Sequence, residues 1–128
     1  MFYFVSLYFI GDTTTLTANY GEIFYPHEHH YNIRKSWKIR VSSGSKIMLV
    51  MHMPLFDFHE DCPYDYLEVR DGGSSSSQLL GKFCRTPPKF WLLSSGNEMF
   101  ITLITDGNYE SKFKLYYSTF SGQLPNGK

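Results

Sequence analysis

The sequence predicts an all-β sandwich, and three observations lead to this prediction. First, the 128 residues include ten Tyr and eleven Phe, and such aromatic residues, together with β-branched ones, favour pleated and half-buried strands over helices. Second, short segments of alternating apolar and polar residues recur with turn residues between them. Third, no stretch of ten or more residues has a convincing helical period. The length is that of one domain with a single core.

Five segments show the period-2 alternation of a half-buried strand, and in chain order they are 37–41, 47–53, 67–70, 99–103 and 113–117. In the first of them, Trp37, Ile39 and Val41 alternate with Lys and Arg. Pro54 is expected to end the second strand, and the run Ser74–Ser77 predicts a flexible hairpin tip. Further turn signals are Ser42–Ser45, Asp71–Gly73 and Asp106–Asn108. Short strands at this spacing are typical of a β-sandwich.

The two ends of the chain differ from this pattern. Residues 1–11 begin with a run of ten residues that are apolar or aromatic except for Ser6, about half of what a membrane-spanning helix needs. The basic region and the cleavage site of a signal peptide are also missing. The segment stays unassigned, as a signal remnant, a cloning remnant or an extra strand. We expect the domain to span residues 12–120 and residues 121–128 to form a tail or linker.

Charge and motifs argue against several classes of function. Twelve basic residues balance twelve acidic ones, so no basic field exists to attract nucleic acid or to favour membrane insertion. No Gly-x-Ser-x-Gly elbow and no Gly-rich phosphate loop occurs, which predicts that the chain is not an enzyme. The run His27–His30 lacks the second His of a zinc-protease motif, because Tyr31 stands there, and is interpreted as a solvated loop. His52 and His59 are interpreted as ordinary strand or loop residues.

The two cysteines, Cys62 and Cys84, allow two interpretations of about equal weight. They are either free buried thiols in a cytosolic protein or one disulfide in a secreted protein. A bridge would close a loop of about 23 residues and contribute roughly 3 kcal/mol to stability.

Carboxylates gather near the first cysteine, and Asp106 follows some forty residues later. One interpretation is turn chemistry, since Asp often stabilises loops by accepting hydrogen bonds from its own backbone. The other is a calcium site, because Ca²⁺ takes six to eight oxygen ligands, often from separate loops. Sequence spacing alone leaves both open for the four acidic residues around Cys62, which are Asp57, Glu60, Asp61 and Asp65.

The segment 55–72 resembles the centre of a CUB domain, in which an apolar strand leads to an acidic residue, then to Cys-x-Tyr-Asp-Tyr and to a strand ending in Asp-Gly. Tyr20–Ile23 resembles the opening of this family, Gly81–Cys84 its strand with the partner cysteine, and Thr105-Asp106 its Ser-Asp loop. The resemblance covers about residues 18–119. It implies a CUB-type sandwich of two antiparallel sheets, jelly-roll-like, over residues 12–120.

The resemblance also implies a disulfide between Cys62 and Cys84, and with it a secreted or extracellular protein. Family members usually have a further N-terminal disulfide, for which this chain has no cysteines. The N-terminal CUB domains of complement-activating serine proteases lack that bridge too. The segments Tyr20–Ile23 and Lys35–Trp37 are similar to theirs.

Many CUB domains bind one Ca²⁺, and the family's ligand positions are, in this sequence, Asp57, Asp65 and Asp106. Asn108 adds an oxygen from the same loop as Asp106, and Tyr31 matches the tyrosine that supports the acidic cluster. Asp57 is one methylene shorter than the Glu usual at its position, so Glu60 is the alternative ligand.

The function implied by the resemblance is an extracellular, calcium-dependent protein–protein interaction module. It would be part of a secreted multidomain protein and would recognise a partner that presents a lysine. The alternatives are a spermadhesin-like binder of glycans or phospholipid, and a metal-free structural spacer. Enzymatic activity would belong to a protease domain outside this chain. The sequence leaves the oligomeric state open.

Overall fold

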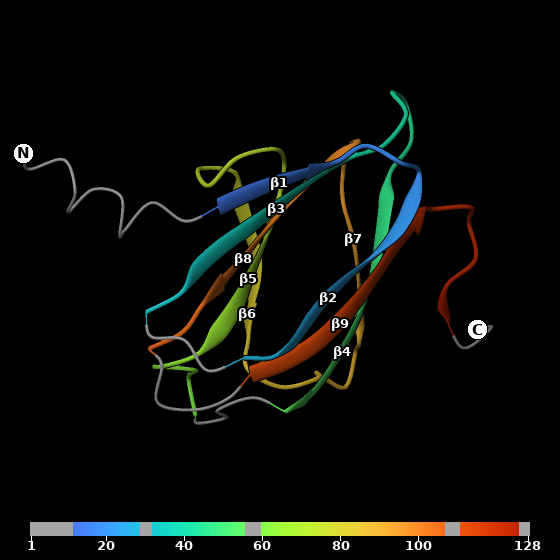
Figure 1. The fold of residues 1–128 in the computed structure, drawn as a ribbon. Helices are drawn as coiled ribbons and strands as arrows, with labels where there is room; N and C mark the ends of the chain where they lie inside the picture. Colours follow the sequence, from blue (N-terminus) through green and yellow to red (C-terminus); the bar gives the residue numbers. More distant parts are fainter. Residues whose placement is uncertain (1–11, 29–31, 56–59, 107–110, 126–128) are drawn as a thin grey trace, which may run out of the picture.

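The computed structural model describes residues 12–28, 32–55, 60–106 and 111–125, and in this part the chain forms two β-sheets packed face to face (Figure 1). The predicted all-β sandwich is confirmed. One sheet has five strands in the order β1-β3-β8-β5-β6, and the other has four in the order β2-β9-β4-β7. No helix in the described ranges is long and apolar enough to cross a membrane.

The strands have the following bounds. The five-stranded sheet contains β1 (Asp12–Leu16), β3 (Arg34–Arg40), β8 (Glu98–Ile104), β5 (Tyr66–Asp71) and β6 (Gln78–Phe83). The four-stranded sheet contains β2 (Tyr20–Glu28), β9 (Ser111–Thr119), β4 (Ile47–Leu55) and β7 (Trp91–Leu93). The five segments predicted by alternation correspond to β3, β4, β5, β8 and β9.

Strand β4 continues past the residue expected to stop it. Pro54 lies inside the strand, in an irregular stretch where the pairing with β9 shifts between His52 and Leu55. Proline has no N–H to donate, and a bulge leaves a residue unpaired, so the ladder tolerates it there. The prediction that Pro54 ends the strand is therefore wrong.

The described backbone tests two further expectations. His27 and Glu28 are the last residues of β2 and not part of a loop, while His29 and His30 lie outside the described residues. The tip at Ser74–Ser77 is a turn as predicted. It is tied by hydrogen bonds from Ser77 N to Ser74 O (3.1 Å) and from Ser74 N to the Ser77 Oγ (3.2 Å).

Strand β1 departs from the antiparallel pattern, because it pairs with β3 in parallel, from Asp12 opposite Lys35 to Leu16 opposite Ile39. Four of its five residues are exposed, and three of those are threonines. A strand at the edge of a sheet with such polar side chains has no apolar period to detect. It therefore escapes a prediction based on alternation.

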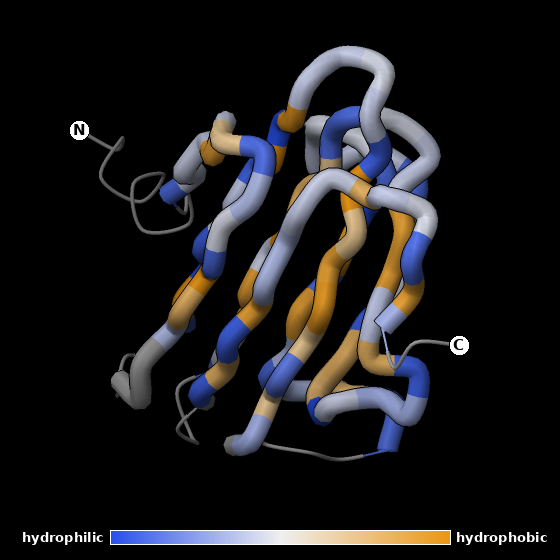
Figure 2. Tube along the Cα trace, turned by 90° about the vertical axis from the view of Figure 1, so that its right-hand side faces the viewer, coloured by the Kyte–Doolittle hydropathy of each residue, from blue (hydrophilic) through white to orange (hydrophobic). Residues whose placement is uncertain are grey.

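The core lies between the two sheets, and Figure 2 shows hydrophobic positions alternating with hydrophilic ones along several strands. Phe113 is fully buried; its ring stacks on Tyr25 at 5.5 Å between centroids and meets Trp37 edge-on at 5.8 Å. Tyr117 packs so closely on Gly21 that a Cβ there would lie 2.8 Å from its ring. A side chain at position 21 would thus displace the Tyr117 ring, whose hydroxyl donates to Ala18 O at 3.2 Å.

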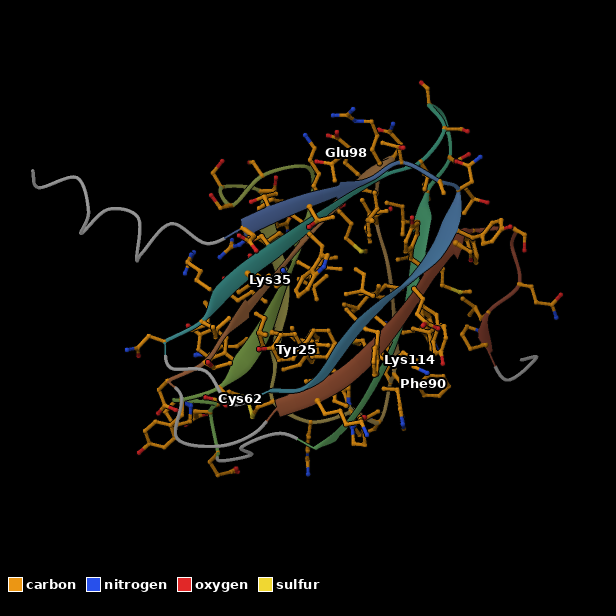
Figure 3. All side chains as sticks on the ribbon, in the orientation of Figure 1. Tyr25, Lys35, Cys62, Phe90, Glu98 and Lys114 are labelled. Carbon is orange, nitrogen blue, oxygen red and sulfur yellow. A yellow bond between two sulfur atoms is a disulfide. The ribbon has the colours of Figure 1, made fainter. Side chains whose placement is uncertain are left out.

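A small charge cluster lies on the five-stranded sheet around Glu98, which Figure 3 labels. Arg40 Nε donates to Glu98 Oε2 at 2.9 Å, and Lys38 Nζ lies 3.6 Å from the same oxygen. The hydrogen bond from Arg40, supported by the charges of both bases, holds the pKa of Glu98 below its ordinary value of 4.5, although partial burial opposes the shift.

This cluster predicts a pH dependence of stability. Because the folded state has the lower pKa, ionised Glu98 stabilises the fold above pH 4.5 and loses this contribution as the pH falls through its folded-state pKa. The effect is at most about 1 kcal/mol, since the pair is partly exposed. We expect Glu98→Gln to reduce the stability difference between about pH 7 and about pH 3 by that amount in urea unfolding. Glu22→Gln, which removes an exposed carboxylate on β2, is the control. If Glu98→Gln and Glu22→Gln changed the stability difference between the two pH values equally, the prediction would be contradicted.

Candidate metal centre

Strand pairing brings three loops to one end of the sandwich (Figure 1). Ile104, the last residue of β8, pairs with Arg34 at the start of β3 and with Tyr66 at the start of β5. The segment before β3, the segment before β5 and the segment after β8 therefore meet. Side chains about forty residues apart in the sequence become neighbours there, which the spacing alone did not reveal.

Two of the predicted ligands are in contact at this end. Asp65 immediately precedes β5 and is fully buried, and its Oδ1 accepts a hydrogen bond from the backbone N–H of Asp106 at 3.0 Å. Asp106 follows β8 and is partly buried. A buried carboxylate is costly unless hydrogen bonds or a cation compensate its charge. Here the hydrogen bond from Asp106 compensates part of that cost.

The segment before β3 is held to the same place. Thr105 N donates to Ile33 O at 3.0 Å, and Ile33 N donates to the Thr105 hydroxyl at 3.3 Å. These two bonds extend the β3–β8 ladder by one step and fix the residue next to Asp106. Sequence reasoning singled out Thr105 as part of a motif but gave it no role; its role is to hold Ile33.

The described non-glycine residues with positive φ all lie at this end: Asn32 (52°), Asp61 (63°) and Cys62 (46°). The left-handed region is uncommon for residues with a side chain, so the turns here have constrained shapes. Cys62 forms the implied disulfide with Cys84, with 5.6 Å between the Cα atoms. This confirms the expected pairing, and it fixes the segment before β5 to the end of β6, three residues before Asp65 (Figure 3).

The remaining predicted ligands have different outcomes. Glu60, the alternative ligand, is exposed. Asp57, Asn108 and Tyr31 lie outside the described residues, so their roles stay predictions. Within the described ranges, no three His, Cys, Asp or Glu side chains come together as a metal site.

Comparison with known proteins identifies the family. A family model described as "CUB domain" matches residues 11–117. Bone morphogenetic protein 1 of Xenopus laevis is 35% identical over 94 residues, which are 73% of this chain and 13% of that protein. Neuropilin-1a of Danio rerio is 34% identical over 116 residues, which are 86% of this chain and 12% of that protein. The chain thus spans a small part of the length of these relatives.

Solved structures show the same fold. The crystal structure of the MASP-1 CUB2 domain bound to Ca²⁺ superimposes with a TM-score of 0.69 at 22% identity, over 82% of this chain and 96% of that one. The family match covers most of the chain, and the topology agrees with it. The chain therefore belongs to the CUB domain family, whose members are extracellular, non-catalytic modules of protein–protein interaction in multidomain proteins.

Proposed function

We propose that residues 12–120 form a calcium-dependent interaction module that receives a lysine side chain of a partner protein. The module would belong to a secreted multidomain protein and would have no catalytic activity of its own, with residues 121–128 as a tail or linker. The observation that supports this most strongly is the contact between Asp65 and Asp106, which joins a fully buried carboxylate to a second acidic residue at the converging loops.

The donor set fits calcium better than a softer metal. Ca²⁺ prefers six to eight oxygen ligands and tolerates irregular geometry, whereas zinc sites use thiolates and imidazoles. Asp65 and Asp106 supply carboxylates from two loops, and both cysteines are engaged in the disulfide. Two residues do not fill the coordination sphere, so Asp57 and Asn108 are proposed as further ligands, with Glu60 as the alternative to Asp57 and Tyr31 as support. The MASP-1 CUB2 domain, a structural neighbour, was crystallised bound to Ca²⁺.

Lysine recognition follows from the same carboxylates. An ammonium group is a compact cation with three donors, and carboxylates that bind a metal through one oxygen keep further lone pairs for such a donor. A partner's lysine would then pair with the acidic side chains beside the ion. Calcium would order the loops and so fix the spacing of the oxygens that receive the ammonium.

Thermal unfolding with and without calcium tests this proposal. We expect the melting temperature in about 2 mM Ca²⁺ to exceed that in EDTA by about 4–8 °C, because binding at ten times the Kd stabilises by roughly 1.4 kcal/mol. Asp65→Asn and Asp106→Asn should each abolish the shift. Asn at position 65 retains a carbonyl oxygen for the Asp106 N–H, so this variant removes the charge and keeps the hydrogen bond.

The chain offers a matched control at the other end of β5. Asp71 Oδ1 accepts the N–H of Ser95 at 2.9 Å, the same kind of bond as that between Asp65 and Asp106. Asp71→Asn should leave the calcium shift unchanged. A shift that survives in Asp65→Asn and Asp106→Asn would locate the ion elsewhere. No shift at any calcium concentration would remove the mechanism and leave the glycan-binding or spacer alternatives.

A further inference from the structure

The outward surface of the four-stranded sheet combines exposed aromatic side chains with lysines. The strand pairing sets Phe24 of β2, Lys114 of β9 and His52 of β4 in one row across three strands. In the next row Tyr116 lies between Glu22 and Val50. We call this surface the aromatic–lysine face and define it by Phe24, His52, Pro54, Lys112, Lys114 and Tyr116.

Large apolar side chains are exposed on this side of the sheet. Among the described residues, five large hydrophobic side chains are the most exposed, and three of them belong to β2 and β9: Tyr20 (76%), Phe24 (50%) and Tyr116 (44%). A groove of about 480 Å³ opens here, lined by five of the residues of the face and by Phe113 beneath them. Its volume lies within the range of about 300–1,000 Å³ that is usual for binding pockets.

Among the described residues, the lysines of the face have no acidic partner. The Nζ of Lys114, a residue that Figure 3 labels, lies 5.4 Å from the centre of the Phe24 ring and 5.9 Å from that of Tyr116. The two aromatic rings hold the ammonium group over the face. In the described structure neither Lys112 nor Lys114 forms an ion pair. Glu22, one row away on the same side, pairs with neither of them.

On the five-stranded sheet, four basic side chains have acidic partners. Lys35 pairs with Asp12 at 3.2 Å, and Lys38 and Arg40 pair with Glu98. Arg70 pairs with Glu68 at 3.4 Å. The chain as a whole has no net charge, but Lys112 and Lys114 line the groove without an ion pair in the described structure. These two lysines make the face complementary to an anion.

We propose that the aromatic–lysine face binds an acidic segment of a partner protein. One aromatic or aliphatic side chain of that segment enters the groove between Phe24 and Pro54, and flanking carboxylates pair with Lys112 and Lys114. The apolar lining favours such a peptide over a polysaccharide, whose hydroxyl groups would meet Phe24, Pro54 and Phe113. None of the residues that line the groove is a candidate calcium ligand, so the site needs no calcium.

Titration by NMR tests the proposal on the isotope-labelled chain with a defined probe. The probe is an acetylated, amidated heptapeptide, Gly-Glu-Glu-Phe-Glu-Glu-Gly, in buffer with EDTA. We expect amide shifts to change along β2, β9 and β4, with the same affinity after calcium is added. A peptide with Gln for every Glu loses the charges that pair with the lysines, and a peptide with Ala for Phe loses the ring that enters the groove. Each should therefore bind at least about three times more weakly.

Matched variants locate the binding. Lys114→Gln should weaken binding about three- to fivefold, and Lys112→Gln with Lys114→Gln about tenfold or more. Lys82→Gln is the control, because Lys82 Nζ lies over the Tyr66 ring at 4.2 Å on the other sheet. Lys82→Gln should leave the affinity unchanged. The amide signals of every variant should stay dispersed, which shows that the variants are folded. Since the titration runs in EDTA, its result is independent of the calcium proposal.

Three outcomes would overturn the proposal. The first is an absence of shifts on β2, β9 and β4 at about 5 mM peptide, a concentration above the Kd expected for a weak surface contact. The second is an equal loss of affinity in Lys82→Gln and Lys114→Gln. The third is binding of heparin or of phosphatidylserine vesicles at this face without binding of the peptide, which would assign it to a glycan or a membrane.

Discussion

Replacing Phe113 by alanine is expected to lower the free energy of unfolding by about 3–5 kcal/mol. The Phe113 ring is fully buried and contacts Tyr25 on the neighbouring strand β2 and Trp37 on β3, in the opposite sheet. The substitution would remove apolar burial, leave a cavity and end both ring contacts, of which the one with Trp37 joins the two layers of the sandwich. Urea unfolding followed by tryptophan fluorescence measures the loss.

Two further variants make this result interpretable. Phe113→Leu keeps most of the buried volume and should cost clearly less than alanine, which guards against a variant that does not fold at all. Phe24→Ala removes the same ring from a half-exposed position on β2 and should cost about 1 kcal/mol or less. Equal losses for Phe24→Ala and Phe113→Ala would contradict the described packing.

Removing the disulfide is expected to have the second-largest effect. The double variant Cys62→Ala with Cys84→Ala should lose about 3 kcal/mol, because the bridge spans a sequence separation of 22 and restricts the unfolded chain. Cys84 is almost fully buried, so alanine is a better replacement than serine at this position. Urea unfolding of the variant and of the oxidised protein measures the difference.

The same variant has a local consequence at the candidate metal centre. The disulfide lies three residues before Asp65, so its loss loosens the segment that precedes β5. We expect the calcium-induced rise in melting temperature to shrink in the double variant, even under conditions in which it is folded. Unchanged unfolding midpoints in the double variant and in the reduced native chain would contradict the stabilising role of the bridge.

Sequence reasoning predicted the strands whose two faces differ in polarity. Ile39 and Val69 alternate with polar neighbours and have the inward positions that alternation assigned to them. Strand β2 has Ile23 and Tyr25 inward but Phe24 outward, so apolar residues occupy both faces and hide the period. Strand β7 has only three residues, too few to show any period.

Prediction of the candidate site required knowledge of long-range strand pairing. Local turn chemistry accounts equally well for Asp65 and for Asp106, and nothing in the spacing brings them together. Their contact results from the antiparallel pairing of β5 with β8, a long-range feature that only the family resemblance supplied in advance. The free lysines of the aromatic–lysine face were not predicted either, because the partners of Lys35 and Lys38 become visible only in the fold.

The position of β9 also determines when the molecule can fold. β9 lies between β2 and β4, and Tyr20 pairs with Ser118, so the centre of the four-stranded sheet includes the last strand of this domain. A nascent chain that ends before residue 111 has β2 and β4 without the strand that joins them. Ile23, Leu49 and Met51 then remain accessible to chaperones and to other chains. Formation of this sheet is thus delayed until nearly the whole domain has left the ribosome, and its long-range pairing makes folding slow compared with that of a helical domain of equal size.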